Sequence, residues 1–206
     1  HLDGMAYDSD GGNVNAIFQY NLSHNNEGGF FLFCPYGNNV NQGTVVRYNI
    51  SQNDSYRGFE NCDGTVTGAK VYNNTIYIGS GISQVVVNEN TSKVRDVKMS
   101  NNIIYKGGTG TASFNLIANT AYAFANNTIS SWITQIPANP GGTTANPLMC
   151  NPGTANSLGT ATGYRLQAAS PAIHTGTPAA NNGGRDYFGS TIANPPNIGA
   201  SESTGC

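Results

Sequence analysis

Acidic side chains that could do chemistry are scarce in this chain, yet several recur at nearly regular intervals. Asp3, Asp8 and Asp10 fall close together in a chain that has only 11 carboxylates. Glu27 follows Asp3 by 24 residues (27 minus 3), and Asp54 follows Glu27 by 27 (54 minus 27). Oxygen ligands of this kind suit Ca²⁺. The candidate metal ligands are Asp3, Asp8, Asp10 and Glu27.

The same carboxylates could instead hydrolyse a glycosidic bond. That reaction uses two carboxyl groups about 5 to 10 Å apart, one of them with a raised pKa. Asp8 or Asp10 paired with Glu27 could supply them, and His24, three residues before Glu27, could tune the site. The alternative is turn chemistry, because Asp-Gly and Asp-Ser-Asp-Gly-Gly are ordinary corner sequences.

Histidines offer one further chemistry. An N-terminal histidine can chelate copper through its amine and imidazole, with a second histidine completing the site. His1 could act in this way only with His24 or His174, since the chain has 3 histidines. A β-rich repeat is not the usual scaffold for such a site, so copper is the weakest of these hypotheses.

A repeated phrase determines where these side chains lie. Residues 18–23 read FQYNLS and return at 46–51 as VRYNIS, with three looser copies further on. Each copy is a short alternating run bounded by Gly and Asn, which favours strands over helices. A period in this range is typical of a solenoid, in which each repeat buries its apolar face against its neighbours. Steps of 28, 25, 28 and 25 residues separate the marker asparagines of the copies, Asn21, Asn49, Asn74, Asn102 and Asn127.

Two columns of residues before the markers predict the faces of the strands. The residue two positions before each marker is mostly polar, and the residue before that is always apolar. Strand side chains alternate between faces, so the apolar column should point inward and the polar column outward. The marker suits a tight corner, because Asn tolerates positive φ, and stacked asparagines can hydrogen-bond into a ladder. The inward column is Phe18, Val46, Val71, Met99 and Phe124; the outward one is Gln19, Arg47, Tyr72, Ser100 and Ala125.

Cysteine spacing gives an independent test of this register. Cys34 and Cys62 each lie 13 residues after a marker (34 minus 21, 62 minus 49). Equal phase on adjacent coils puts them about 4.8 Å apart, inside the separation that a disulfide needs. We therefore predict a Cys34–Cys62 bridge, which leaves Cys150 and Cys206 to pin the C-terminal tail. An even number of cysteines also favours an oxidising compartment and a secreted, extracellular protein.

These features predict an all-β protein, a right-handed parallel β-helix. Residues 1–136 would form the coils and residues 137–206 an irregular tail packed on the solenoid, because Pro, Gly and Asn punctuate the chain from Pro137 onwards. A β-sandwich is the alternative, but sandwiches lack a sustained period of this length. The chain begins without a cap on its first coil, so we expect either further N-terminal coils or a capping subunit.

Composition excludes several classes of function. Charged residues make up 10% of the 206 residues, the formal net charge is −2 and no basic stripe is present, so a nucleic-acid partner is not expected. No apolar run reaches about 18 residues, so no membrane span is expected. The hydrophobic content of 38%, at periodic positions, argues against disorder.

The tail carries a more specific signal. Leu166 is followed by Ser-Pro-Ala-Ile at 170–173 and by Gly176, residues 185–189 read RDYFG, and residues 198–202 read IGASE. This pattern resembles the C-terminal signature of secreted β-helix proteins in the pectate-lyase-like superfamily, of the type found in actinomycetes and fungi. The resemblance implies a carbohydrate-related lineage with a polysaccharide partner. It implies no single activity, because that superfamily holds lyases, hydrolases, epimerases and non-catalytic members.

A lyase route follows from this resemblance, and β-elimination on a uronate-containing glycan is the function that we predict, ahead of a non-catalytic role and of hydrolysis. In β-helix lyases Ca²⁺ or a basic residue neutralises a uronate carboxylate, which acidifies the neighbouring carbon, and a Lys or Arg removes its proton. The candidate bases are Arg57, Arg47, Lys70 and Lys98. Arg57 could equally form an ion pair with Asp54 or Glu60, and the two lysines could be a solvated stack. The catalytic candidates for cleavage by either route are Asp8, Asp10, His24, Glu27 and Arg57.

Tyrosines could bind the glycan, because aromatic faces stack on sugar rings. Tyr77 and Tyr105 share one phase, three residues after their markers, and could form a small ladder. These tyrosines could also do no more than stabilise the coils. Without an acid/base pair the protein would be a non-catalytic carbohydrate-binding or structural β-helix. The candidate substrate-binding residues are Tyr20, Tyr48, Tyr77 and Tyr105.

Overall fold

Three parallel sheets wind around one core. A computed structural model of the chain describes residues 4–89, 95–117 and 121–206. Strands from successive coils pair in parallel within each sheet, with the register that the repeat predicts. The chain therefore forms a parallel β-helix of about 4 turns. In the described part of the chain no helix is long and apolar enough to cross a membrane.

Each coil contributes one strand to each sheet. Sheet A contains β1 (Met5–Asp10), β4 (Gly29–Cys34), β8 (Tyr56–Asn61), β11 (Gln84–Glu89) and β14 (Ala112–Asn115). Sheet B contains β2 (Ile17–Gln19), β6 (Val45–Arg47), β9 (Thr65–Tyr72), β12 (Arg95–Ser100) and β15 (Ala121–Ala125), with β5 (Val40–Gln42) paired to β9. Sheet C contains β3 (Leu22–His24), β7 (Ile50–Gln52), β10 (Thr75–Ile78), β13 (Ile103–Lys106) and β16 (Thr128–Ile129).

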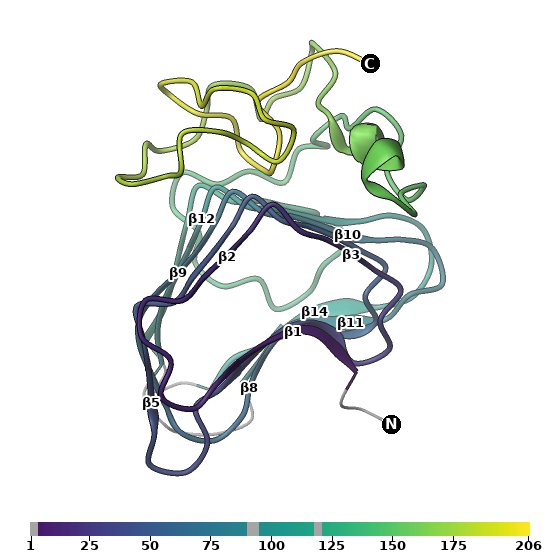
Figure 1. Cartoon of the computed structure of the whole chain (residues 1–206). Helices are drawn as coiled ribbons and strands as arrows, with labels where there is room; N and C mark the ends of the chain where they lie inside the picture. The colour runs from purple at the N-terminus through teal and green to yellow at the C-terminus, as the bar shows by residue number, and fades with distance from the viewer. Residues whose placement is uncertain (1–3, 90–94, 118–120) are drawn as a thin grey trace.

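The handedness and the position of the tail are both visible along the solenoid axis. Seen from the N-terminal end, the chain runs clockwise from β1 to β2 and β3 as it recedes, so the helix is right-handed (Figure 1). The tail lies outside the coils, over the corner between sheets B and C. It leaves the outer face of sheet A uncovered, on the opposite side of the solenoid.

The inward column of the repeat forms part of the core. Val46, Val71 and Met99 are buried, Phe124 is nearly so, and Phe18 packs against them. Aromatic rings from sheet A fill the other half of the interior, with Phe31 in edge-on contact with Phe18 and Phe33. Burial of this apolar surface is the main force that holds each coil against the next.

An asparagine ladder runs along the corner between sheets B and C. In the rung between Asn49 and Asn74, the Asn74 side-chain oxygen accepts from the Asn49 backbone N–H at 3.1 Å and from its amide Nδ2 at 2.9 Å. Every marker repeats this pattern, and Asn139 of the tail supplies a further rung beyond Asn127. The predicted ladder is thus confirmed.

The marker asparagines do not have the positive φ that was predicted for them. The left-handed backbone lies one residue before each marker, because the marker must direct its amide along the axis while the preceding residue turns the corner. Three of these corner residues are asparagines, which tolerate this conformation, and two are tyrosines. They are Tyr20, Tyr48, Asn73, Asn101 and Asn126.

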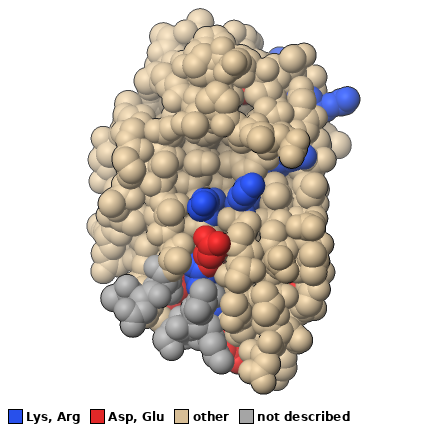
Figure 2. Space-filling view, turned by 90° about the vertical axis from the view of Figure 1, so that its left-hand side faces the viewer, with Lys and Arg blue, Asp and Glu red and all other residues tan. Residues whose placement is uncertain are grey.

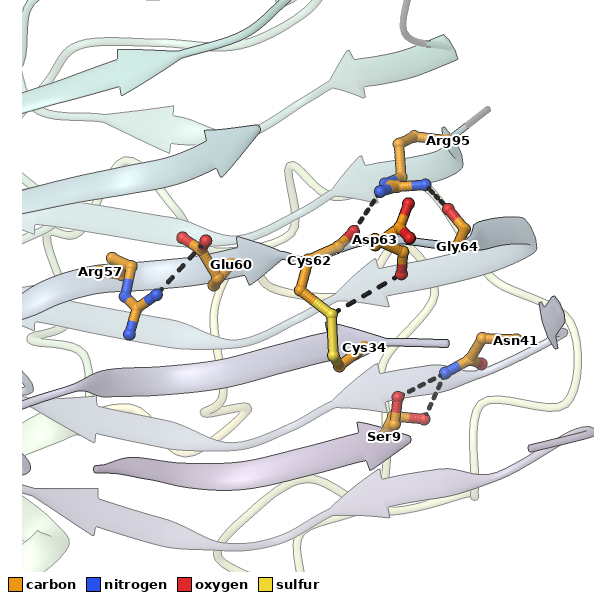
Figure 3. The surroundings of a disulfide bond; sticks show 9 residues. All are labelled: Ser9, Cys34, Asn41, Arg57, Glu60, Cys62, Asp63, Gly64 and Arg95. Carbon is orange, nitrogen blue, oxygen red and sulfur yellow. Dashed lines mark hydrogen bonds and ion pairs between the residues drawn. A yellow bond between two sulfur atoms is a disulfide. The ribbon is translucent and has the colours of Figure 1, made fainter. Parts of the chain in front are cut away.

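Both predicted disulfides are present. Cys34 ends β4 and Cys62 directly follows β8, with a Cα–Cα separation of 4.9 Å (Figure 3). Cys150 and Cys206 join the two ends of the tail, with Cα atoms 5.6 Å apart. The first bridge ties adjacent coils at the corner between sheets A and B, and the second closes the tail on itself.

The tail is attached to the solenoid by side-chain hydrogen bonds. The Gln52 amide exchanges two hydrogen bonds of 2.8 Å with the backbone of Ala155, just before the 3-10 helix η1 (Leu158–Tyr164). The corner residues Asn73 and Asn101 donate to the carbonyls of Asn197 and Thr177, each at 2.8 Å. The tail therefore contacts several coils at once.

The residues of the C-terminal signature hold the turns of the tail. The Ser170 hydroxyl donates to the Pro147 carbonyl. The Asp186 carboxylate accepts from the backbone N–H groups of Ser190 at 2.7 Å and Glu202 at 2.6 Å. The Glu202 carboxylate in turn accepts from the Asn197 N–H at 3.1 Å. The motif that carries the family resemblance is structural in this chain.

Stability should fall as pH rises because of Glu202. Burial raises its pKa from 4.5 to about 7, while N–H groups of Asn197 and Ala193 act in the opposite direction. The folded state therefore holds this proton more tightly than the unfolded state does, so the contribution to stability is complete below pH 4.5 and is lost as pH rises to about 7. Thermal unfolding at pH 5 and pH 8 should show a lower Tm at about pH 8. The variant Glu202→Gln should reduce this difference; an unchanged difference would assign it to other groups.

Candidate functional site

Two exposed carboxylates project from the outer face of sheet A. Asp8 and Asp10 are exposed on β1, while Ser9 between them is fully buried, at 0% exposure. This alternation places both aspartates on the outer face, with Cα atoms about 6.6 to 6.8 Å apart. The tail lies on the opposite side of the solenoid and does not cover the pair (Figure 1).

A row of outward-pointing side chains, polar except for Leu32, continues from Asp8 along the solenoid; Leu32 is 9% and Glu60 2% exposed. Asp8 is in register with Leu32, and Leu32 with Glu60. The Glu60 carboxylate accepts from the Asn88 amide at 2.6 Å, and the Asn88 side chain accepts from the Asn115 amide at 2.8 Å. This row gives the face hydrogen-bonding groups on four of its five strands.

Arg57 takes part in this network as an ion-pair partner. Its guanidinium lies 3.3 Å from the Glu60 carboxylate (Figure 3). Its Nε donates to the Gly28 carbonyl at 3.2 Å, and its Cζ lies 4.6 Å from the centre of the Tyr56 ring. The ion-pair interpretation of Arg57 is confirmed for Glu60 rather than for Asp54. An arginine held in three directions is poorly placed to act as a mobile base.

Glu27 and His24 do not join the aspartates. Glu27 precedes β4 at the corner between sheets C and A, five residues (32 minus 27) before Leu32, the register partner of Asp8. At about 3.3 Å per residue this is about 16 Å along the sheet. His24 lies on sheet C, beside Asn25. The predicted pairing of Asp8 or Asp10 with Glu27 is therefore wrong. Glu27 lies at a corner before β4, whereas the aspartates lie on β1.

The predicted metal ligands that the structure describes do not form a metal-binding site. Asp3 and His1 lie outside the described residues, and Asp8, Asp10 and Glu27 do not gather. Across residues 4–89, 95–117 and 121–206 no three His, Cys, Asp or Glu side chains are close enough to hold a metal ion. His174 of the tail lies against the Pro195 carbonyl at 3.1 Å. Ca²⁺ and copper stay untested predictions from the sequence.

Asp54 is a structural carboxylate. It is fully buried at the corner between sheets C and A. Its Oδ2 accepts from the hydroxyls of Ser23 and Ser51, both at 2.6 Å, and its Oδ1 accepts from the Asn26 backbone at 3.0 Å. These bonds compensate for the burial of the group and hold successive coils together at this corner.

The predicted tyrosine surface is mostly covered. Tyr48 is 1% exposed, and the Tyr20 hydroxyl donates to the Arg185 carbonyl beneath the tail at 3.1 Å. Tyr77 and Tyr105 do form the predicted stack, with centroids 6.3 Å apart, but Tyr164 of the tail packs edge-on against Tyr77 at 6.0 Å. A sugar-binding role is therefore wrong for Tyr48, because the tail occupies that position.

Tyr105 reaches an open cleft that contains the single tryptophan of the chain. The cleft measures about 270 Å³, and Trp132 on its rim is 64% exposed. The Lys106 ammonium at its edge lies within hydrogen-bond distance of four backbone carbonyls, so its charge is largely satisfied by the protein. The remaining polar groups of the cleft are neutral: Ser130, Ser131, Thr144 and Asn146. Sequence reasoning missed Trp132, although a lone tryptophan in a Ser-Ser-Trp turn was a usable signal.

A buried ion pair lies inside the corner between sheets A and B. Glu89 and Arg95 are fully buried, 3.2 Å apart. Arg95 also donates to the carbonyls of Cys62 and Gly64 (Figure 3). Burial raises the pKa of Glu89, and Arg95 acts in the opposite direction. Because both groups are closed off from solvent, they contribute to the corner and not to the outer surface.

The comparisons with known proteins point to carbohydrates. The chain is similar to a lacto-N-biosidase of Bifidobacterium longum subsp. longum, with 35% identity over 91 residues. The match covers 44% of this chain and 5% of that protein, so the chain corresponds to a small part of the relative. No family model matches the chain. The weak similarity and the β-helix fold fit a carbohydrate-active protein, and the two disulfides are consistent with secretion.

Proposed function

We propose that this protein is a secreted carbohydrate-active enzyme that hydrolyses glycosidic bonds on the outer face of sheet A. The observation that carries the proposal is the exposed Asp8 and Asp10 pair on one face of β1. Two residues on one strand face stand about 6.6 to 6.8 Å apart at their Cα atoms. Carboxyl groups on that spacing fall within the separations of roughly 5 to 10 Å that glycosidases use.

Other acidic pairs on this face are less suitable. Glu60 shares its outward row with Asp8, two strand spacings or about 9.6 Å away, but it is only 2% exposed. Glu60 is also held by Arg57 and Asn88, so it is poorly placed to exchange a proton with a substrate. Asp8 and Asp10, both exposed on β1, are therefore the pair that we propose.

Hydrolysis accounts for these positions better than elimination does. A lyase needs a Lys or Arg free to take a proton next to a neutralised uronate. Arg57 is the only arginine on the outer face of sheet A in the described residues, and it is bound to Glu60 and Gly28. The candidate lysines, Lys70 and Lys98, lie on sheet B instead.

Product analysis tests the reaction type. The protein is incubated with a panel of oligosaccharides, beginning with glycans that end in lacto-N-biose, the unit in the name of the similar protein. Hydrolysis should release a new reducing end with no ultraviolet absorbance from an unsaturated uronate. Products with that absorbance would replace this proposal with the lyase route. Absence of cleavage across the panel, together with binding, would replace it with a binding module.

The Trp132 cleft favours that second function, a non-catalytic carbohydrate-binding β-helix. Its exposed indole can stack on a sugar ring, and its neutral hydroxyl and amide groups can bond sugar hydroxyls. No carboxylate lines it. A glycan held there would be bound and not cut.

Tryptophan fluorescence measures this binding directly, because Trp132 is the single tryptophan of the chain. A neutral disaccharide should shift the emission of Trp132 as the indole is covered. Replacement of Tyr105 by alanine should weaken binding about tenfold, the loss of one aromatic contact of about 1.4 kcal/mol. The matched control is Tyr36→Ala, because Tyr36 is exposed far from the cleft. Equal titrations for both variants would show that the cleft is not a sugar site.

A further inference from the structure

A basic hollow lies on the outer face of sheet B, where that face meets the tail. Figure 2 shows a small group of basic side chains, with an acidic one beside it, in the middle of a face that is otherwise almost uncharged. The hollow measures about 220 Å³. Its lining consists of Lys70, Tyr72, Lys98, Ser100, Ala179 and Ala180.

Strand register brings the two lysines side by side. Lys70 on β9 is paired with Lys98 on β12, one strand spacing away, and both are exposed. The neighbouring strands cannot balance them, because the positions in register are Val45 on β6 and Ala123 on β15. Like charges at directly paired positions destabilise a sheet. The shared phase of the lysines was predicted from the sequence; the hollow around them was not.

Neither lysine forms an ion pair among the described residues. In the described part of the chain no carboxylate lies within 4.0 Å of either ammonium group. Asp96 is on the same face, two residues before Lys98, and its carboxylate accepts the Gly68 backbone N–H at 3.0 Å. Its single negative charge offsets only one of the two positive charges. The fold therefore keeps two adjacent positive charges at the edge of a hollow, where an anion would relieve their repulsion.

The floor of the hollow adds an oriented donor. Tyr72 is 4% exposed, and its hydroxyl oxygen accepts from the Arg47 guanidinium at 2.9 Å. Arg47 is itself buried beneath the tail and pairs with no carboxylate among the described residues. Because Arg47 occupies the oxygen of Tyr72, the phenolic hydrogen is directed away from it. No acceptor for that hydrogen occurs in the described part of the chain, so it is available to a ligand.

We infer that this hollow binds an anionic group of a glycan, a carboxylate or a sulfate. Lys70 and Lys98 would neutralise its charge, the Tyr72 hydroxyl would donate to one oxygen, and Ser100 would bond a neighbouring sugar hydroxyl. The glycan as ligand rests on the proposed function; the anion rests on the charges alone. The site lies on a different sheet from Asp8 and Asp10, so it would select or retain acidic chains rather than cleave them.

Calorimetric titration tests this site with three probes: a galacturonate trisaccharide, a sulfated galactose trisaccharide and the neutral galactose trisaccharide. An acidic probe should bind more tightly than the neutral one, and more weakly as salt is raised. The double variant Lys70→Gln, Lys98→Gln should lose about tenfold in affinity for it, since two exposed ion pairs together contribute about that factor. The acidic probe that binds more tightly identifies the group. Equal binding of acidic and neutral probes would overturn the inference.

Two control variants separate this site from the rest of the molecule. Arg185→Gln removes one exposed positive charge from the tail and should leave affinity for the acidic probe unchanged. Asp8→Asn with Asp10→Asn removes the proposed catalytic pair and should also bind as the parent does. Acidic binding without any hydrolysis would refute the proposed function and leave this site standing. Hydrolysis, together with unchanged affinity of the lysine double variant for the acidic probe, would support the proposed function and refute this anion site.

Discussion

Replacement of Asp8 or Asp10 by asparagine should reduce glycan hydrolysis by a factor of about a hundred to ten thousand, the usual contribution of a positioned acid or base. Asparagine keeps the size of the side chain but can neither donate an acidic proton nor act as a base. Both side chains are exposed on β1, so neither change should disturb the core. Initial rates of reducing-end release, at substrate concentrations above and below KM, give the effect on kcat and kcat/KM separately.

The control for this experiment is Asp63→Asn. Asp63 is an exposed carboxylate just beyond β8, next to the Cys34–Cys62 bridge and off the strand that carries the proposed pair (Figure 3). Its loss changes the net charge by the same amount and should leave hydrolysis intact. A thousandfold loss for Asp63→Asn, or full activity for both β1 variants, would move the catalytic centre away from Asp8 and Asp10.

Replacement of Asn74 by alanine should destabilise the fold by about 3 to 5 kcal/mol. Asn74 is fully buried in the middle of the ladder. Its amide donates to Asn102 and to the Val46 carbonyl, and its oxygen accepts two bonds from Asn49. Alanine would leave these groups buried without partners, and each unsatisfied group costs about 1 to 3 kcal/mol. Urea unfolding followed by circular dichroism measures the change.

The matched variant is Asn21→Ala, at the first rung. Asn21 donates to Asn49 by the same geometry, but it is only half-buried and accepts nothing from a preceding marker in the described residues. Its removal should cost about 1 kcal/mol, the net value of an ordinary hydrogen bond. If both variants lose the same stability, the ladder acts through each rung separately and burial of the central amides is not decisive.

The fold could be predicted because the same sequence pattern occurs in every coil. The asparagine markers, the apolar column from Phe18 to Phe124 and the phase of Cys34 and Cys62 all report one register, so an error in one copy is corrected by the others. The position of Asn74 in a ladder follows from that register alone. The left-handed corner, one residue earlier, could not be obtained in this way, because periodicity does not say which of two adjacent asparagines turns.

The candidate site was less predictable because corners and tail do not repeat. Strand pairing between β4 and β8 has an offset of 28 residues (59 minus 31), whereas Asp54 follows Glu27 by 27 (54 minus 27). Because of this difference of one residue, Asp54 is not at the position equivalent to Glu27 on the next coil. Asp54 is buried, whereas Glu27 is exposed. Tyr48 is buried beneath the tail, and the path of the tail could not be predicted because the tail contains no repeat. Asp8 and Asp10 were candidates from their residue type alone; their exposure on one face of β1 comes from the structure.

The tail also changes how the whole molecule should respond to stress. Ordinary solenoids can melt coil by coil, since each repeat contacts only its neighbours. Here one closed segment bonds Gln52 on an early coil through Ala155, Asn73 on the next through Asn197, and Asn101 on the one after through Thr177. A coil cannot leave without breaking its link to a segment that the other coils still hold. Unfolding is therefore expected to be a single cooperative transition, and the fold gains the all-or-none character of a globular domain.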